Sequence, residues 1–421
     1  MPPIAKGLGL PWDVECDDPV AALATARRDL GDTFVVDSGD DRYLFTFSPE
    51  GVAAFYALDE ADASKGVADW RMLRRKVPDE LFAGRRTLPH ALFSRDDVAL
   101  YLANLDHALD TTIDELGVGG EVDVFAFTRR LGHRIGLASW GGPGAAIGAR
   151  FDELVAALDV LDGSESFVHP DAMAAVAASD QAAERAALEQ ATELIVNGID
   201  DTSADEEGLF ARIADAWRDE PDHVRRIGIA HDVVLIHIAS MSNLFAALGW
   251  AIVDLVEHPA ERDAVAAGDA TLAEQCALES TRLAQRSIMS RYVLHDVALD
   301  IGDTTLTVAA GATIATLLPL TNLTTAPGLE RWDPARWHRR RLVDASSLAA
   351  VELVTAFGHG RHSCPAQSFS LAAMRTTLMQ LAATFALTAR WTDHPAPVAA
   401  QIGGVARAAT PTQLYYSRRS A

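Results

Sequence analysis

One short segment near the C-terminus, residues 357–366, combines a cysteine with a glycine-rich loop. Gly358 and Gly360 allow the backbone to turn sharply and to approach a ligand closely. Because proline lacks an amide proton, Pro365 suits the first position of a helix that has Cys364 as its N-cap. The apolar residues that follow repeat at helical spacing. The positive end of a helix dipole favours a thiolate over a thiol, so we expect a thiolate at Cys364.

The chemistry that suits such a thiolate is ligation of a haem iron, because an axial thiolate supports oxygen activation. The rival interpretation is a metal site made of His359, His362 and Cys364. That site has no plausible fourth ligand nearby and leaves the glycines unexplained. The other two cysteines, Cys16 and Cys276, are interpreted as small buried apolar residues.

The segment resembles the haem-binding loop of the cytochrome P450 family, whose pattern is Phe-x-x-Gly-x-Arg/His-x-Cys-x-Gly/Ala. The residues that fill this pattern are Phe357, Gly360, His362, Cys364 and Ala366. The resemblance implies haem b (iron protoporphyrin IX) ligated by Cys364, with Phe357, Gly358 and Ala366 against it. It also implies the cytochrome P450 fold, which is mainly α with small β-sheets, in a single large domain spanning residues 1–421.

Two upstream motifs occur in the order that the family shows. Glu279 and Arg282 are three residues apart on a predicted helix, Leu272–Gln285, so they share one face. Arg336 lies in the aromatic-x-Pro-x-Arg segment that precedes the cysteine loop. The resemblance implies that these three residues form a buried charge network with a structural role. Such a network is tolerated only if it is fully hydrogen-bonded.

The two propionates of a haem require cations or hydrogen-bond donors. The resemblance places His362 and Arg291 at positions that contact a propionate. A third contact is assigned to Arg85, with Arg86 as its neighbouring alternative. Leu81 stands where the family has an aromatic residue or a histidine, which is a departure from the pattern.

A long apolar segment, Val233–Val256, carries the main departure from the family. It is long enough to span a membrane, but polar residues at its middle and polar flanks favour a buried core helix. Residues 239–243 take the place of the usual Ala-Gly-x-Asp/Glu-Thr, so Ser242 and Asn243 replace an acid and a threonine that support proton delivery. Neither titrates near neutral pH, so the acid of the relay is missing. We expect Asn243 to hold an oxygen ligand or water and Ser242 to pass a proton through water. The alternative is helix packing, with serines bonded to helix carbonyls.

Composition narrows the class of protein. The chain has 421 residues and a formal net charge of −23, which argues against nucleic acid as a partner. Three cysteines without regular spacing fit a reducing cytoplasm. The N-terminal residues lack the apolar stretch of a signal peptide or anchor, so we expect a cytoplasmic protein without membrane attachment.

The elements that position these motifs can also be predicted. Phe34–Asp37 and Arg42–Phe47 read as a β-hairpin, followed by a helix with Ser48 as its N-cap. The chain from Asp97 onward is mainly helical by its apolar spacing. Short strands and turns are expected over Val293–Leu320 and Leu387–Tyr416.

Taken with the resemblance, these observations favour a monooxygenase that inserts one oxygen atom into a hydrophobic small molecule, such as a steroid, terpenoid, fatty acid or polyketide. Electrons would come from a separate ferredoxin or flavodoxin with its reductase, which the basic residues 339–341 and Arg361 could dock. The first alternative is an isomerase, dehydratase or peroxygenase, which needs no electron donor. The second is a non-catalytic activator or ligand carrier. The substrate pocket is expected to be apolar and lined by the region before Phe93, by Met241–Phe245 and by Ile402–Val405.

Overall fold

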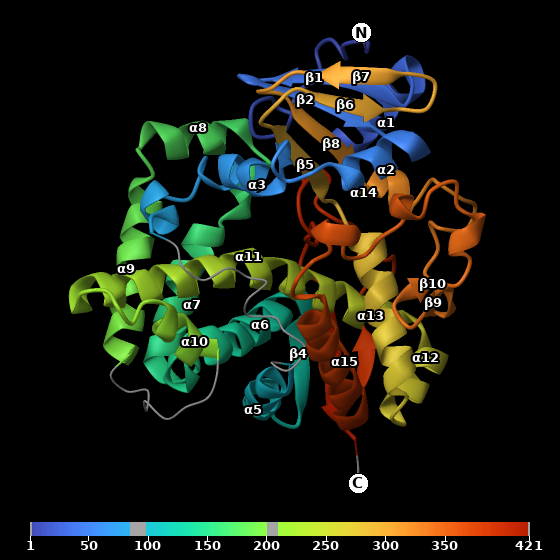
Figure 1. Ribbon diagram of the computed structural model, residues 1–421. Helices are drawn as coiled ribbons and strands as arrows, with labels where there is room; N and C mark the ends of the chain where they lie inside the picture. The colour runs from blue at the N-terminus through green and yellow to red at the C-terminus, as the bar shows by residue number, and fades with distance from the viewer. Residues whose placement is uncertain (1, 85–97, 200–208, 420–421) are drawn as a thin grey trace.

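Helices make up most of the protein, and a five-stranded sheet lies at one end of the helical body (Figure 1). The computed structural model describes residues 2–84, 98–199 and 209–419. The helices are α1 (Pro19–Leu30), α2 (Pro49–Ala57), α3 (Lys65–Leu73), α5 (Val98–Leu116), α6 (Val124–Trp140), α7 (Gly148–Asp162), α8 (Pro170–Ala178), α9 (Ala182–Ile199), α10 (Leu209–Ala216), α11 (Asp222–Glu257), α12 (Pro259–Ala266), α13 (Ala270–Ala284), α14 (Leu318–Asn322) and α15 (Gln367–Thr384). The strands are β1 (Thr33–Ser38), β2 (Asp41–Thr46), β3 (Ala63–Ser64), β4 (Gly119–Asp123), β5 (Ile288–Val293), β6 (Val297–Asp300), β7 (Thr305–Val308), β8 (Thr313–Leu317), β9 (Trp337–His338), β10 (Arg341–Leu342), β11 (Phe385–Ala389) and β12 (Gln413–Arg418).

The five-stranded sheet has the order β1-β2-β8-β5-β3 and is buried on both faces. Successive side chains of a strand point to opposite faces. Phe34 and Val36 accordingly join one apolar cluster, whereas Val35 joins another. The central strand β8 is buried along its whole length and divides its side chains between the same two clusters. This packing fixes β5, the strand that carries Arg291, between β8 and β3.

The hairpin predicted near the N-terminus is confirmed. β1 and β2 pair antiparallel, with Ser38 opposite Asp41 at the turn. Helix α2 follows, and its N-cap Ser48 accepts a hydrogen bond from the Gly51 amide at 3.0 Å. The strands predicted over 293–320 and 387–416 are also present, as parts of β5 to β8 and as β11 and β12. The predicted helix over 272–285 is α13.

Helix α11 crosses the middle of the molecule and packs against α6, α9 and α13 (Figure 1). At 36 residues it is longer than predicted, and by length and composition alone it would pass for a membrane span. The apolar window that gives this result is 78% buried within the protein, as expected of a core helix. Within this buried stretch only Ala239 and Asn243 are exposed, four residues apart and therefore on one face.

Candidate functional site

The cysteine loop is closed by hydrogen bonds that the chain makes with itself. The Cys364 amide donates to the Phe357 carbonyl at 2.7 Å, and the Phe357 amide donates to Thr355 Oγ1 at 3.1 Å. Gly358 has φ +78°, and a Cβ there would lie 2.6 Å from the His362 carbonyl oxygen. Only glycine fits this position, because it alone satisfies both the left-handed backbone and the close approach. The loop therefore presents Cys364 at a fixed place before α15.

Two details of the predicted loop are corrected. Helix α15 begins at Gln367 with Ala366 as its N-cap, so Cys364 and Pro365 lie in the turn before the helix. Burial raises the pKa of the Cys364 thiol. The amide hydrogen bonds of Ala366 and Gln367 and the charge of Lys65 lower it, but the effect of burial is larger. The protein alone thus favours the thiol and not the expected thiolate. A coordinated metal ion would reverse this balance, because it deprotonates a thiol outright.

His359, His362 and Cys364 are not arranged as the metal site of the rival interpretation. Nε2 of His359 lies 3.2 Å from the Val354 carbonyl, and the His359 ring packs edge-on against Tyr56. Across residues 2–84, 98–199 and 209–419, no group of three or more His, Cys, Asp or Glu side chains is arranged to hold a metal ion. Of the other cysteines, Cys276 is buried as expected, but Cys16 is only partly buried.

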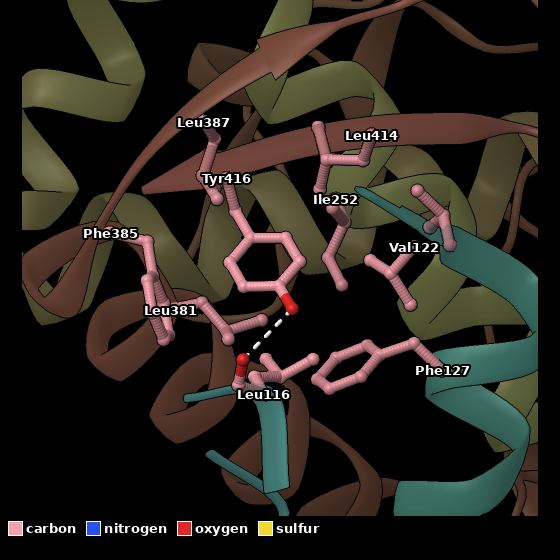
Figure 2. A pocket seen from close by; sticks show the side chains of 10 residues that line it. Leu116, Val122, Phe127, Ile252, Leu381, Phe385, Leu387, Leu414 and Tyr416 are labelled. Carbon is pink, nitrogen blue, oxygen red and sulfur yellow. Dashed lines mark hydrogen bonds between the residues drawn. The ribbon is translucent and has the colours of Figure 1, made fainter. Parts of the chain in front are cut away.

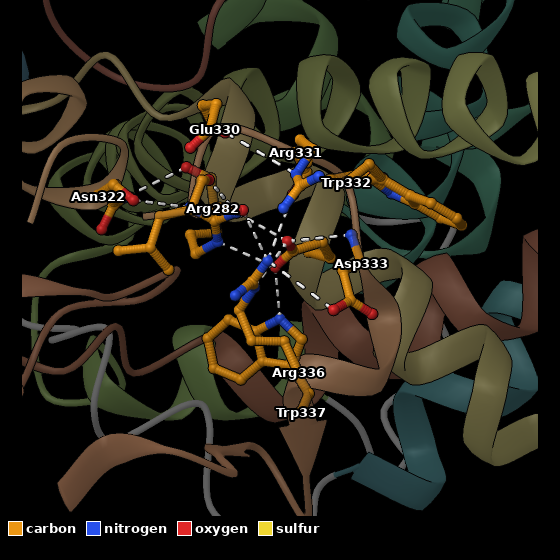
Figure 3. A network of polar contacts seen from close by, with 12 residues as sticks. Arg282, Asn322, Glu330, Arg331, Trp332, Asp333, Arg336 and Trp337 are labelled. Carbon is orange, nitrogen blue, oxygen red and sulfur yellow. Dashed lines mark hydrogen bonds and ion pairs between the residues drawn. The ribbon is translucent and has the colours of Figure 1, made fainter. Parts of the chain in front are cut away.

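The predicted charge network is present and centres on Glu279, whose side chain is 0% exposed. Figure 3 labels its partners Arg282, Arg336 and Trp337. Arg282 donates to both of its carboxylate oxygens, at 2.9 and 2.7 Å. Arg336 Nε donates at 3.2 Å, and the indole of Trp337 donates at 2.8 Å. The Arg282 guanidinium, also 0% exposed, donates in addition to the carbonyls of Asn322 and Leu329. Each buried charge is therefore satisfied, which is the condition for such a network to be tolerated.

Asn322 joins this network to the cysteine loop. Its Nδ2 donates to the carbonyls of Arg282 and Thr355, at 3.1 and 2.8 Å. Its Oδ1 accepts from the Thr355 amide at 2.8 Å. Thr355 is also the residue whose hydroxyl holds the Phe357 amide. The charge network on α13 thus reaches the backbone that shapes the loop, which supports a structural role for the network.

Two of the residues assigned to the propionates have buried hydrogen-bond donors without partners in the described structure. Arg291 donates through one nitrogen to the carbonyls of Leu58 and Ala63, each at 2.8 Å, but its Nε and its other terminal nitrogen have no partner. His362 Nε2 is likewise buried and unpaired. Burial, followed by the charge of Arg291, lowers the pKa of His362. Unpaired buried donors are rare, and this pair fits an anionic group such as a propionate. Arg85 and Arg86 lie outside the described residues.

A cavity of about 680 Å³ lies beside the exposed face of α11. It is lined by α11 at Ala239, Ser242 and Asn243, by residues 287–290 and by residues 401–405. Met241 is buried and does not line it. The predicted apolar character holds only in part, because Arg129, Asp162, Gln401 and Arg407 also line the cavity. A volume of this size is typical of a small-molecule site.

The structure supplies an acid that the sequence pattern of α11 lacks. The Ser242 hydroxyl donates a hydrogen bond to Oδ1 of Asp162, the last residue of α7. Arg129 of α6 donates to Oδ2 of the same carboxylate at 3.2 Å. Both Ser242 and Asp162 line the cavity. Helix α11 itself still lacks the acid, as expected, but Asp162 brings a carboxylate to Ser242 from a different helix.

The Asn243 side chain has a structural bond on one side and a free donor on the other. Its Oδ1 accepts from the Val405 amide at 2.9 Å, which ties α11 to the segment after residue 400. A Cβ on the neighbouring Gly404, where φ is +66°, would lie 2.5 Å from this oxygen. No described residue accepts a hydrogen bond from the Asn243 Nδ2. Because Asn243 also lines the cavity, it combines the packing role with an unpaired donor at the cavity wall. Ser240 fits the helix-packing alternative, since its hydroxyl donates to the Ile236 carbonyl at 2.5 Å.

Sequence reasoning also missed a polar chain that continues from Asp162 into the core. Arg129 bridges Asp162 and Asp159. Asp159 lies 2.9 Å from Nε2 of His133, whose Nδ1 lies 2.9 Å from Nε2 of His237 on α11. Burial lowers the pKa of both histidines, in the case of His237 well below its ordinary value. These residues come from three helices, and the i, i+4 spacing of Arg129 and His133 on α6 is the one local pattern that could have pointed to them.

The basic residues considered for docking are only partly available. Arg340 is engaged by Glu274 through two hydrogen bonds, at 2.9 and 3.1 Å. Arg361 is 80% exposed and lies 3.5 Å from Asp59. Arg339 and Arg341 are exposed. The candidate docking surface therefore carries less free positive charge than the sequence indicates.

A second, smaller hollow lies apart from this site (Figure 2). It is enclosed by apolar side chains of α5, α6, α11, α15 and the β4–β12–β11 sheet, and its volume is about 20 Å³. The hydroxyl of Tyr416 donates across it to the Leu116 carbonyl at 3.0 Å. An apolar gap of this size is a packing defect and has no room for a substrate.

Comparison with known proteins bears on the fold alone. No protein-family model matches the chain, and no curated protein matches it significantly. Among solved structures, the retinoic acid-bound cyanobacterial CYP120A1 is similar, with a TM-score of 0.74 and 14% sequence identity. The alignment covers 100% of this chain and 99% of that chain. A likeness at this identity carries the architecture and not the activity. The predicted fold class is thereby confirmed: the chain has the cytochrome P450 fold.

Proposed function

We propose that this protein is a haem-thiolate monooxygenase. It inserts one oxygen atom from dioxygen into a hydrophobic small molecule and takes electrons from a separate ferredoxin or flavodoxin with its reductase. The observation that carries the proposal is the pair of buried, unpaired donors on Arg291 and His362, because they suit a carboxylate near the Cys364 loop. The P450 fold supports the same assignment.

The residues that would hold haem b (iron protoporphyrin IX) are Cys364, which would bind the iron through its sulfur, and Arg291, His362 and Arg85, which would receive the propionates. Phe357, Gly358 and Ala366 would shape the loop that receives the haem. When bound, a thiolate-ligated haem supplies the activation of dioxygen with electrons delivered one at a time. The protein contributes the position of the cysteine and the charges that receive the propionates.

On the cavity side, Asp162, Ser242 and Asn243 have distinct tasks in this proposal. Asp162 holds the Ser242 hydroxyl, so a carboxylate and a hydroxyl meet at the cavity although α11 has no acid there. This pair can hold and pass a proton at Ser242 Oγ. The Asn243 Nδ2 supplies a hydrogen-bond donor beside it. The acid and hydroxyl favour the monooxygenase over the isomerase, dehydratase or peroxygenase alternative, which the apparent loss of an acid had suggested.

The proposed substrate belongs to the steroid, terpenoid, fatty acid or polyketide type, because much of the cavity lining is apolar. CYP120A1 has retinoic acid bound in the structure that this chain resembles, and an apolar molecule of that general type suits this cavity. We further propose that residues 1–421 form one domain and that the protein works in the cytoplasm.

The test of cofactor and ligand is spectroscopic. The reduced protein with carbon monoxide should show the red-shifted band of a thiolate-ligated haem, Cys364→Ala should abolish it, and Cys276→Ala should keep it. A thiolate spectrum unchanged in Cys364→Ala would refute the assignment. Turnover then separates the reactions: dependence on reduced ferredoxin and dioxygen supports the monooxygenase, whereas full turnover without oxygen, peroxide or reductant would refute it.

A further inference from the structure

The cations that line the large cavity differ in how they are neutralised. Lys65 is paired with Asp69. Arg129 donates to the carboxylates of Asp159 and Asp162. Arg407 also lines the cavity, and no ion pair joins it to any side chain in the described part of the chain. Its Nε is buried and has no hydrogen-bond partner.

The backbone of Arg407 is held firmly. Its amide donates to Oε1 of Gln401 at 2.8 Å, and its carbonyl accepts from the Val398 amide at 2.8 Å. Gln401 is itself fixed, because its Nε2 donates to the carbonyls of Gly403 and Val405. The side chain therefore extends from a rigid turn, which is a requirement for a specific contact.

The charged groups around Arg407 do not satisfy it. Burial lowers the pKa of its guanidinium, while Asp162 and Glu165 raise it and Arg129 lowers it. Asp162, which also lines the cavity, is one candidate partner, but its two oxygens already accept from Ser242 and Arg129. Leaving the buried Nε of this guanidinium without an acceptor is costly. A bound anion would remove that cost.

We propose that Arg407 binds an anionic group of the substrate, so that the preferred ligands of this cavity are apolar molecules that carry one carboxylate or a comparable anion. The guanidinium presents a planar set of donors that matches a carboxylate, and the surrounding lining receives the apolar body. This inference rests on the proposal above that the cavity is the substrate site.

The experiment measures binding and needs no turnover. The haem-loaded protein is titrated by calorimetry with lauric acid, abietic acid and lithocholic acid, each compared with its methyl ester. We expect the wild type to prefer at least one acid over its ester by about tenfold or more, as a charged hydrogen bond warrants. Arg407→Gln should remove this preference and Arg407→Lys should retain part of it. Arg390→Gln is the control for loss of one positive charge, because Arg390 is half exposed, pairs with Glu121 and does not line the cavity.

Several outcomes would overturn the inference. These are equal affinity for acids and esters, no binding of any acid, or an acid preference that survives in Arg407→Gln. Loss of haem from Arg407→Gln would also overturn it, because that result would mean that the guanidinium binds a haem propionate and not the substrate. Folding is checked by thermal unfolding, and Arg407→Met serves as a second variant because no internal hydrogen bond of the side chain is lost. The carbon monoxide spectrum reports separately on the proposed function, so a normal thiolate band with no acid preference would refute this inference alone.

Discussion

Replacing Glu279 by glutamine tests whether the charge network holds the fold together. The substitution keeps the size of the side chain but removes its charge. Arg282 then stays fully buried beside a neutral amide, which cannot accept hydrogen bonds from all the donors that now bond to the Glu279 carboxylate. Breaking a buried ion pair in this way costs about 3–5 kcal/mol. Since whole proteins are stable by about 5–15 kcal/mol, we expect a large fall in the urea midpoint and in haem content.

Glu274 provides a matched control on the same helix. It also accepts two hydrogen bonds from one arginine, Arg340, but its side chain is 20% exposed and that of Arg340 is 36% exposed. Pairs of this kind contribute about 0–1 kcal/mol, so Glu274→Gln should leave the midpoint nearly unchanged. Equal losses in the two variants, measured by equilibrium urea unfolding of the haem-loaded protein, would refute the claim that burial decides the effect.

Three further predictions follow from individual contacts. Gly358→Ala should destabilise the protein more than Gly360→Ala in urea unfolding, because both have positive φ but a Cβ meets the backbone only at Gly358; the left-handed backbone alone costs about 1–2 kcal/mol. Asn243→Ala should lower stability by about 1 kcal/mol through loss of the bond to Val405, whereas Asn243→Asp, which keeps the acceptor, should not. Burial raises the pKa of Asp254 from 3.8 to about 6, so the folded state binds the proton more tightly and stability should fall as pH rises from about 4 to 6, by about 3 kcal/mol in total. Asp254→Asn should remove this fall, and an unchanged pH profile of thermal unfolding in the variant would contradict the assignment.

The features that sequence could predict are those set by local pattern. The β1–β2 hairpin, the Ser48 cap and α13 each depend on residues within a few positions of one another. The cysteine loop belongs to the same class, because its shape depends on glycine at Gly358 and on short-range hydrogen bonds. The helix start after Cys364 was misplaced by two residues, since a proline fits the turn before a helix as well as its first position.

The features that sequence could not predict arise from contacts between distant segments. Asp162 reaches Ser242 across 80 residues, and nothing in either neighbourhood specifies that meeting. Arg407 enters the cavity from a turn whose sequence reads as apolar, because the chain from Ile402 to Ala406 dominates the pattern. The pKa of the Cys364 thiol was misjudged for a related reason: burial is a property of the whole fold, whereas the helix end is visible locally.

The link from Asn322 through Thr355 to the cysteine loop has a consequence for how the protein is assembled. The loop is ordered by bonds within the chain, so a cofactor that arrives after folding meets a receptor already in its final shape. Ordering a free loop would cost about 1–2 kcal/mol per residue in conformational entropy, and preorganisation removes that loss from the association step. The amide proton of Cys364, held by the Phe357 carbonyl, should accordingly exchange slowly with solvent even in the apoprotein. Folding would thus precede cofactor binding, and Cys364 would already hold its final position when the cofactor binds.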